Sequence, residues 1–179
     1  MRRILVLVAT VLGLLVLPAV PAAAAPEATC AVTWGSQAKS AGPSTSPFSE
    51  LVNVRTGRHA CFDRLVVDLD GPASGYLVRY VNVYRADGSG QAIPLPGGAK
   101  IEIIVRAPAI DMNGDPTYPG VVGQRLPGVT VAGYDTFRST RYGGAFEGQT
   151  SLGLGVRARL PFRVMKIGNR VVIDVAHHW

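Results

Sequence analysis

Arginine and tyrosine side chains recur close together in two strand-like segments of this sequence, where they suit recognition of an acidic sugar polymer. The segment 136–142 reads Thr-Phe-Arg-Ser-Thr-Arg-Tyr, and the segment 76–85 carries a second Arg-Tyr pair. Guanidinium groups match the geometry of carboxylates and phosphates, and aromatic rings stack on sugar faces. An ordinary solvent-facing strand with its aromatics in the core is the competing interpretation. The candidate binding residues are Arg79, Tyr80, Arg138, Arg141 and Tyr142.

Carboxylates are also spaced in a way that would allow acid–base chemistry. Asp68 and Asp70 share one face of the strand expected at 63–70, and Asp63 begins it. A general acid–base pair needs in addition a cleft and one raised pKa. The expected environment of these carboxylates is therefore a solvated strand face. No serine of the sequence occupies a Gly-x-Ser-x-Gly elbow, and we predict that the protein is not an enzyme.

Two groups of oxygen and nitrogen ligands fall short of a metal-site pattern. The segment 111–115 has oxygen ligands at alternate positions, as calcium loops do. Pro116 replaces the required glycine, however, and Val122 stands where the bidentate glutamate belongs, so a plain turn is predicted. His177 and His178 lie at the end of the chain, where a frayed tail is the default. We predict no metal site and no cofactor.

Cys30 and Cys61 are the two cysteines of the chain, and an even count in an exported protein favours a disulfide. The bond would close a loop of about 30 residues and stabilise the fold by roughly 3–4 kcal/mol. It would join the N-terminal segment to the strand region around Phe62. Metal ligation and a redox pair are the alternatives, and no second cysteine or histidine cluster accompanies either residue.

The N-terminal sequence has the pattern of a secretory signal peptide. It begins Met-Arg-Arg, continues with an apolar run to Leu17, and reaches small residues at 22–25. We predict a signal peptide at 1–24 and one mature domain at 25–179, with an uncleaved anchor as the alternative. After cleavage no second apolar stretch is long enough to span a membrane. The net charge of +6 is scattered, which favours acidic polymers or anionic surfaces over nucleic acid as partners.

Strands must position these side chains, because the mature sequence reads as almost entirely β. The 21 glycines and 13 prolines of the chain divide short runs rich in Val, Ile, Leu, Tyr and Thr, and helical periodicity is never sustained. Loops are expected at 35–47 and 108–127, turns at 56–57 and 168–169, and a break at 143–144. Such strands favour a β-sandwich or a small barrel. The expected strands are 30–34, 50–55, 63–70, 76–85, 100–106, 129–132, 136–142, 151–160, 162–167 and 170–176.

Alternation along three of these strands predicts which face is buried. Side chains two residues apart lie on the same face of a strand, so each run has one aliphatic face. The aliphatic faces comprise Leu65, Val67 and Leu69, then Ile101, Ile103 and Val105, and finally Leu152, Leu154 and Val156.

Two segments carry a family resemblance. The segment 54–69 joins an Arg-containing strand, through a Gly turn, to an Arg-aliphatic-Val-aliphatic-Asp-Leu strand, and 169–175, Asn-Arg-Val-Val-Ile-Asp-Val, is a closing strand. With Trp34 and the cysteine pair, the mature chain resembles the AMIN-like proteins secreted by high-GC Gram-positive bacteria. AMIN domains are β-sandwiches of periplasmic or envelope proteins, and the best-known members bind the cell wall to localise murein amidases or secretin channels. This chain differs from those best-known members, which localise amidases or secretins, in its cysteine pair and in the Pro/Gly-rich segment 108–127.

The residues and the resemblance together give one expectation. We predict an exported antiparallel β-sandwich of AMIN-like type with a Cys30–Cys61 disulfide, secreted or located at the cell envelope. Its expected function is non-catalytic binding of peptidoglycan or another acidic wall polymer, with an envelope protein as the alternative partner. An extracellular hydrolase, and a scaffold that pairs an exposed strand with a partner protein, are the alternative functions.

Overall fold

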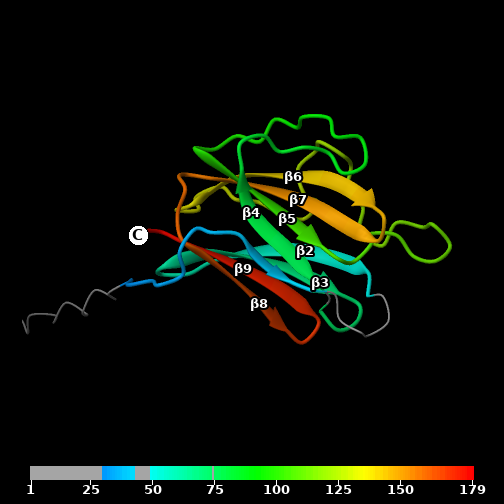
Figure 1. Ribbon diagram of the computed structural model, residues 1–179, viewed down its shortest axis with the longest axis horizontal. Coiled ribbons are helices and arrows are strands. Elements are labelled where there is room, and N and C mark those ends of the chain that lie inside the picture. The colour runs from blue at the N-terminus through cyan, green and yellow to red at the C-terminus, as the bar shows by residue number, and fades with distance from the viewer. Residues whose placement is uncertain (1–29, 43–48, 74) are drawn as a thin grey trace, which may run out of the picture.

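A computed structural model describes residues 30–42, 49–73 and 75–179 of the chain. These residues form an all-β fold in which two antiparallel sheets face each other (Figure 1). The predicted signal peptide at 1–24 lies outside the described residues. The described part of the chain contains no helix with the length and apolar character needed to cross a bilayer. The strands are β1 (Lys39–Ala41), β2 (Leu51–Arg58), β3 (Phe62–Leu69), β4 (Tyr76–Val81), β5 (Ala99–Val105), β6 (Phe137–Phe146), β7 (Gln149–Val156), β8 (Phe162–Ile167) and β9 (Arg170–Ala176).

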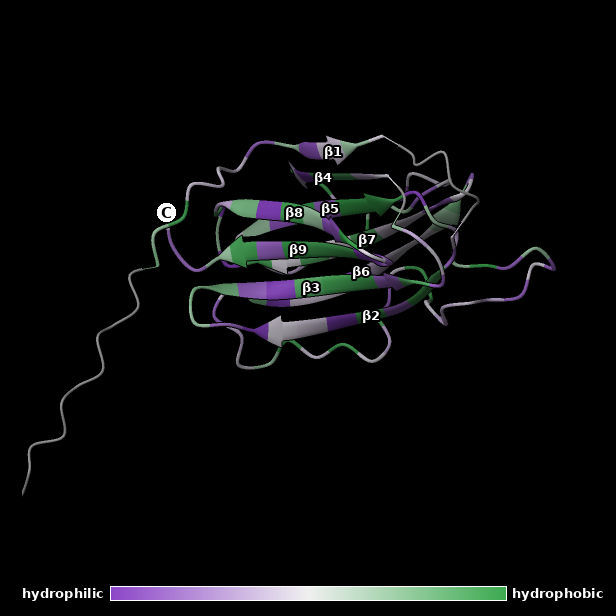
Figure 2. Cartoon of the chain, turned by 90° about the horizontal axis from the view of Figure 1, so that it is seen from below, coloured by the Kyte–Doolittle hydropathy of each residue, from purple (hydrophilic) through white to green (hydrophobic). Residues whose placement is uncertain are grey.

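The smaller sheet has four strands in the order β2-β3-β9-β8. In its centre Leu65 of β3 lies opposite Ile173 of β9, and Val67 lies opposite Val171. The β8–β9 hairpin turns at Gly168, whose φ of 59° suits glycine, and the sequence prediction of a turn there is confirmed. Hydrophobic stretches in β3 and β9 are flanked by charged residues (Figure 2). The inner face is fully buried, and Val66 and Val172 on the outer face are also almost completely buried.

The larger sheet has five strands in the order β1-β4-β5-β7-β6. Ile101 of β5 lies opposite Leu154 of β7, and Ile103 lies opposite Leu152. All four side chains are fully buried, as is Leu65 from the smaller sheet, and they meet in one core between the sheets. The predicted aliphatic faces are therefore confirmed, and each such burial contributes roughly 1.5–3 kcal/mol.

A strap formed by residues 82–97 covers the outer face of the larger sheet. Its Tyr84 is fully buried, and the Tyr84 hydroxyl shares a hydrogen bond of 3.1 Å with the Ser151 hydroxyl. A Cβ atom added at Gly153 would lie 2.6 Å from a ring carbon of Tyr84, so the absence of a side chain lets the ring lie against β7. The outer face of the larger sheet at Gly153 is thus covered by a second, smaller hydrophobic cluster. That cluster comprises Tyr84, Ala86, Ile93 and Leu95.

Two strand predictions were wrong. The segment 30–34 forms no strand, and the first strand is instead β1, inside the predicted loop 35–47. β1 has little intrinsic β propensity, and its place is set by pairing with β4, where Lys39 lies opposite Val78. The segment 129–132 forms no strand and lies between turns at 127–128 and 132–133, where Gly128 and Gly133 have φ values of 71° and 76°.

Two predicted interruptions are absent from the structure. At 56–57 the predicted turn is part of β2, where Gly57 lies opposite Arg64. At 143–144 the predicted break is a bulge inside β6, with the register shifting between Tyr142 and Gly144. Gly144 has a φ of 114°, and a bulge of this kind absorbs an extra residue without ending the strand.

The predicted disulfide between Cys30 and Cys61 is confirmed, with Cα atoms 5.1 Å apart. Next to it, the ring of Trp34 meets the ring of Phe62 edge-on, with centroids 5.7 Å apart. The guanidinium of Arg163 lies 4.3 Å from the centroid of the Trp34 ring, which is a cation–π distance. The N-terminal segment is therefore held against the outer face of the smaller sheet by both covalent and aromatic contacts.

Candidate functional site

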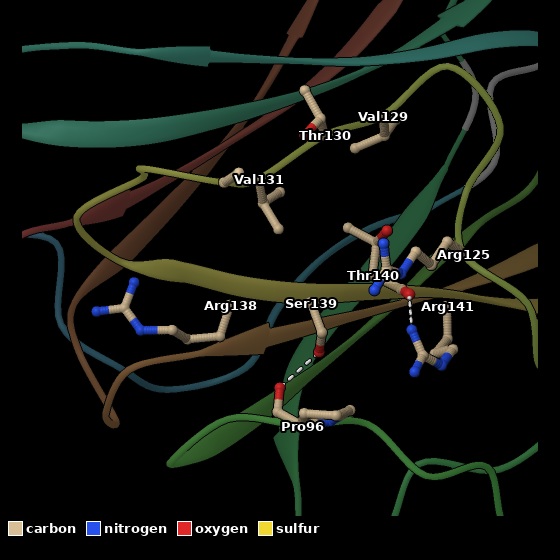
Figure 3. A pocket seen from close by; sticks show the side chains of 10 residues that line it. Pro96, Arg125, Val129, Thr130, Val131, Arg138, Ser139, Thr140 and Arg141 are labelled. Carbon is tan, nitrogen blue, oxygen red and sulfur yellow. Dashed lines mark hydrogen bonds between the residues drawn. The ribbon is translucent and has the colours of Figure 1, made fainter.

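Arg138 and Arg141, which the sequence predicted as binding residues, line one hollow of about 350 Å³ beside β6. Arg125, which the sequence analysis did not single out, lines the same hollow (Figure 3). The three arginines come from two segments, β6 and the long loop before it, and the Arg138 guanidinium points away from those of Arg125 and Arg141 (Figure 3). The other lining residues are Pro96, Val129, Thr130, Val131, Ala132, Ser139 and Thr140.

The loop before β6 is placed by hydrogen bonds along the open edge of that strand. The Tyr142 amide donates to the Gln124 carbonyl at 2.9 Å, and the Gly123 amide donates to the Tyr142 carbonyl at 2.8 Å. The Leu126 amide donates to the Thr140 hydroxyl at 3.4 Å. The chain then reverses and passes through Val129 to Val131 alongside β6 (Figure 3), and the hollow lies beside this turn.

The guanidinium of Arg138 is fixed by backbone carbonyls at the turn before β6. It donates to the Tyr134 carbonyl at 2.8 Å, to the Phe137 carbonyl at 2.9 Å and to the Asp135 carbonyl at 3.0 Å. These bonds use three of its five N–H donors. The Arg141 guanidinium donates one hydrogen bond, of 2.8 Å, to the Thr140 carbonyl. Both heads therefore keep donors that can reach an anion.

The lining residues give the hollow a positive charge and a mixed polarity. None of the ten residues that line it is acidic. Thr140 and Ser139 contribute hydroxyls, although Ser139 already donates to the Pro96 carbonyl. Val129 and Val131 contribute apolar wall. Arginine stays protonated at any ordinary pH, so the hollow can bind carboxylate, phosphate or sulfate groups through charge-assisted hydrogen bonds.

Tyr142 does not take part in this surface, and its prediction as a binding residue is corrected. The side chain is only 5% exposed, because Tyr142 faces the core, opposite Leu152 in the β6–β7 ladder. Its ring lies 6.0 Å from the ring of Tyr118. Burial raises the pKa of the Tyr142 phenol, and the ring serves packing.

The other two predicted binding residues lie on β4, and the structure does not bring them to the hollow. Arg79 donates to Glu102 at 2.7 Å on the outer face. Three strand spacings separate it from Arg141 in the register of the sheet, which is about 14 Å. The Tyr80 hydroxyl accepts from the Leu160 amide and donates to the Leu160 carbonyl. Tyr80 therefore has a structural role at the other edge of the sheet.

Of the three predicted carboxylates, Asp70 is exposed, Asp68 is partly buried and Asp63 is fully buried. Asp68 lies 2.8 Å from Arg55 and 3.4 Å from Arg170, with 16% of its side chain exposed. Asp63 is fully buried, and the prediction of a solvated position was wrong for it. Its Oδ2 atom accepts from the amides of Thr136 at 2.6 Å and Phe137 at 3.1 Å.

The two motifs considered as metal ligands also behave differently. Asp111 accepts hydrogen bonds from the amides of Asn113 and Asp115, both at 2.8 Å, so the predicted turn is confirmed. These amides lower the pKa of the Asp111 carboxyl. His177 was expected in a frayed tail, and this was wrong: it is 6% exposed, and its Nε2 atom lies 3.2 Å from Oδ1 of Asp63.

One protein-family model matches the chain, the AMIN-like domain, over residues 49–177. The match includes eight of the nine strands of the described fold, β2 to β9, and leaves out β1 and Cys30. No curated protein and no solved structure matches the chain significantly. The AMIN-like domain is typically associated with the cell envelope, while a Gram-positive origin stays a prediction. Because the match extends over well more than half of the sequence and both sheets, this chain belongs to the AMIN-like domain family.

Proposed function

We propose that this chain is an exported, non-catalytic binding module of the cell envelope that holds peptidoglycan or another acidic wall polymer in the hollow beside β6. The observation that carries this proposal is that three arginines, Arg125, Arg138 and Arg141, line one hollow whose lining includes no acidic residue. All three groups bind negative charge without taking up protons, which supports binding rather than catalysis.

The build of the hollow suits a polymer that carries repeated anions. The wall contains both cationic donors and the apolar side chains of Val129 and Val131. Each charge-assisted hydrogen bond to an anion contributes roughly 1.5–3 kcal/mol. A single hollow of this size therefore gives modest affinity, and retention on the wall gains from the many equivalent sites that a polymer presents to one molecule.

Three independent features support a location outside the cytoplasm. The segment 1–24 has the signal-peptide pattern. The Cys30–Cys61 disulfide is typical of oxidising compartments. The family of the chain is envelope-associated. We therefore place the mature protein in the cell envelope or in its surroundings.

Co-sedimentation with purified, insoluble cell wall tests the proposal. The double variant Arg138→Glu/Arg141→Glu reverses two charges of the hollow, and we expect it to weaken retention at least about tenfold, as the loss of two charge-assisted bonds implies. Arg106→Glu is the matched control for a single reversal, because Arg106 is exposed and follows the end of β5 that lies away from the hollow.

Three outcomes would contradict the proposal. Equal loss of retention in Arg106→Glu and in Arg138→Glu would show that only the net charge matters. Release of soluble wall fragments by the purified protein would favour the hydrolase alternative. Undiminished retention of the double variant would remove the hollow from the interaction. Repeating the experiment with wall stripped of phosphate polymers distinguishes phosphate from carboxylate as the bound anion.

A further inference from the structure

A second group of chemically active side chains lies apart from the basic hollow, at the end of the sandwich where β9 finishes. Asp63, Asp135 and His177 each offer one ligand atom, and the three atoms lie within 4.8 Å of one another. The His177 Nε2 atom is 3.2 Å from Asp63 Oδ1 and 3.9 Å from Asp135 Oδ2. The sequence predicted no metal site, because His177 was expected in a frayed tail and Asp63 on a solvated strand face.

Asp63 is oriented before any ligand arrives. It stands in β3 with no exposed surface, and its Oδ2 atom accepts from two consecutive backbone amides, those of Thr136 and Phe137. The Oδ1 atom is thereby directed to His177. Outer hydrogen bonds of this kind fix the ligand atoms of metal sites, and a buried carboxylate benefits from a positive partner.

His177 is equally well fixed. Its backbone amide donates to the Cys61 carbonyl at 3.0 Å, next to the disulfide, and its backbone carbonyl accepts from Arg157. The side chain is 7% exposed. The imidazole is therefore presented by a rigid part of the fold.

Asp135 opens the group to solvent. It is 54% exposed and borders a hollow of about 440 Å³ together with Arg157, His177 and His178. Its ion pair with Arg58 is 3.3 Å long, and both side chains are about half exposed. Exposed pairs of this kind contribute little, about 0–1 kcal/mol, so a divalent cation can displace Arg58. An ion can enter through the hollow, where His178 or water supplies a further ligand.

We propose that Asp63, Asp135 and His177 form a binding site for a divalent transition metal, and that Zn²⁺ is the ion it suits best. Calcium and magnesium prefer oxygen ligands alone, whereas imidazole with carboxylates suits zinc. Metal–ligand bonds of about 2.0–2.2 Å in a tetrahedron separate the ligand atoms by roughly 3.3–3.6 Å. The Nε2 atom of His177 lies 3.2 Å from Asp63 Oδ1 and 3.9 Å from Asp135 Oδ2, on either side of this range. The proposal is independent of wall binding.

Isothermal titration of the untagged, disulfide-bonded mature protein with Zn²⁺, after treatment with a chelator, tests the site. We expect saturable binding of one ion per chain. Asp135→Asn removes the exposed ligand with little risk to folding, and we expect affinity to fall at least about tenfold, as for the loss of groups that support metal ligands. Asp115→Asn is the matched control, because Asp115 is an exposed aspartate outside the group, and it should bind zinc like the parent.

Two results would overturn the proposal. The first is an absence of saturable heat with the parent protein, which would mean that His177 and Asp63 form a hydrogen-bonded pair only. The second is full binding by Asp135→Asn with loss of binding in His178→Ala, which would place the ion on the exposed terminal histidine. Circular dichroism of each variant ensures that lost binding is not lost folding.

Discussion

Replacing Gly153 with alanine should detach the strap from the larger sheet while leaving the main core intact. The new Cβ would lie 2.6 Å from one ring carbon of Tyr84, and 2.8 and 2.9 Å from two others. Carbon atoms in contact prefer about 3.5–4.0 Å, so the ring must move by roughly 1 Å or more. Its hydrogen bond to Ser151, at 3.1 Å, cannot survive such a movement without rearrangement.

The expected cost follows from these contacts. Overpacking a filled site costs about 1–3 kcal/mol, and the lost hydrogen bond adds about 0.5–1.5 kcal/mol, so Gly153→Ala should lower the free energy of unfolding by roughly 2–4 kcal/mol. Tyr84→Ala alone should cost about 3–5 kcal/mol. In the double variant Gly153→Ala/Tyr84→Ala the new methyl group meets no ring. Its loss of unfolding free energy should therefore be smaller than the sum of the two single losses by roughly 1–3 kcal/mol.

Urea unfolding of the oxidised protein, followed by tryptophan fluorescence, measures all three variants. Gly57→Ala in β2 is the matched control, because a Cβ there would meet only His59, at 3.8 Å, and it should change stability by less than about 1 kcal/mol. Parent-like stability of Gly153→Ala, or strict additivity with Tyr84→Ala, would refute the account of the strap.

Two further predictions concern charge and pH. Asp174 is fully buried and held by Arg64 at 2.6 Å and Arg163 at 2.8 Å, so Asp174→Ala should cost about 3–5 kcal/mol in urea unfolding, whereas the more exposed Asp68→Ala should cost at most about 1 kcal/mol; equal costs would contradict this. Burial raises the pKa values of Tyr84, Tyr118 and Tyr142. The stabilisation of the fold that depends on keeping these phenols neutral is therefore complete below the unfolded-state pKa, near 10. It is lost as pH rises above that value. Stability should fall steeply above about pH 10, with tyrosinate absorbance rising as the protein unfolds; full ionisation of the folded protein would contradict this.

The strands with strict alternation could be predicted from the sequence because one face of each must be buried. This holds for Leu65 to Leu69 in β3 and for Ile101 to Val105 in β5, where the predicted faces line the core. β1 could not be predicted, because Lys-Ser-Ala carries no strand preference and only the edge of β4 makes it a strand. The glycines at 143–144 were misleading, since a bulge and a break have the same composition.

The candidate site was predictable only where its residues are neighbours in the chain. Arg138 and Arg141 could be found by their density in one segment, but Arg125 arrives from a loop whose course no pattern encodes. Tyr142 was included because it follows Arg141 directly in the chain, but consecutive residues of a strand point to opposite faces, and Tyr142 faces the core beside Leu152. The group around His177 joins residues that are distant in the chain, with 114 positions between Asp63 and His177.

Cys61 brings the beginning and the end of the described fold to one place, since it binds Cys30 covalently and accepts a hydrogen bond from the His177 amide. Figure 1 shows these two regions on one side of the molecule and the loop around residue 114 on the opposite side. Folds with neighbouring ends tolerate circular permutation and insertion into host proteins. A short peptide that joins residues 30 and 179, with new termini opened at Gly114, should therefore give a permuted domain with unchanged sheets. Insertion of the domain into a loop of a host protein should likewise leave the host loop undistorted.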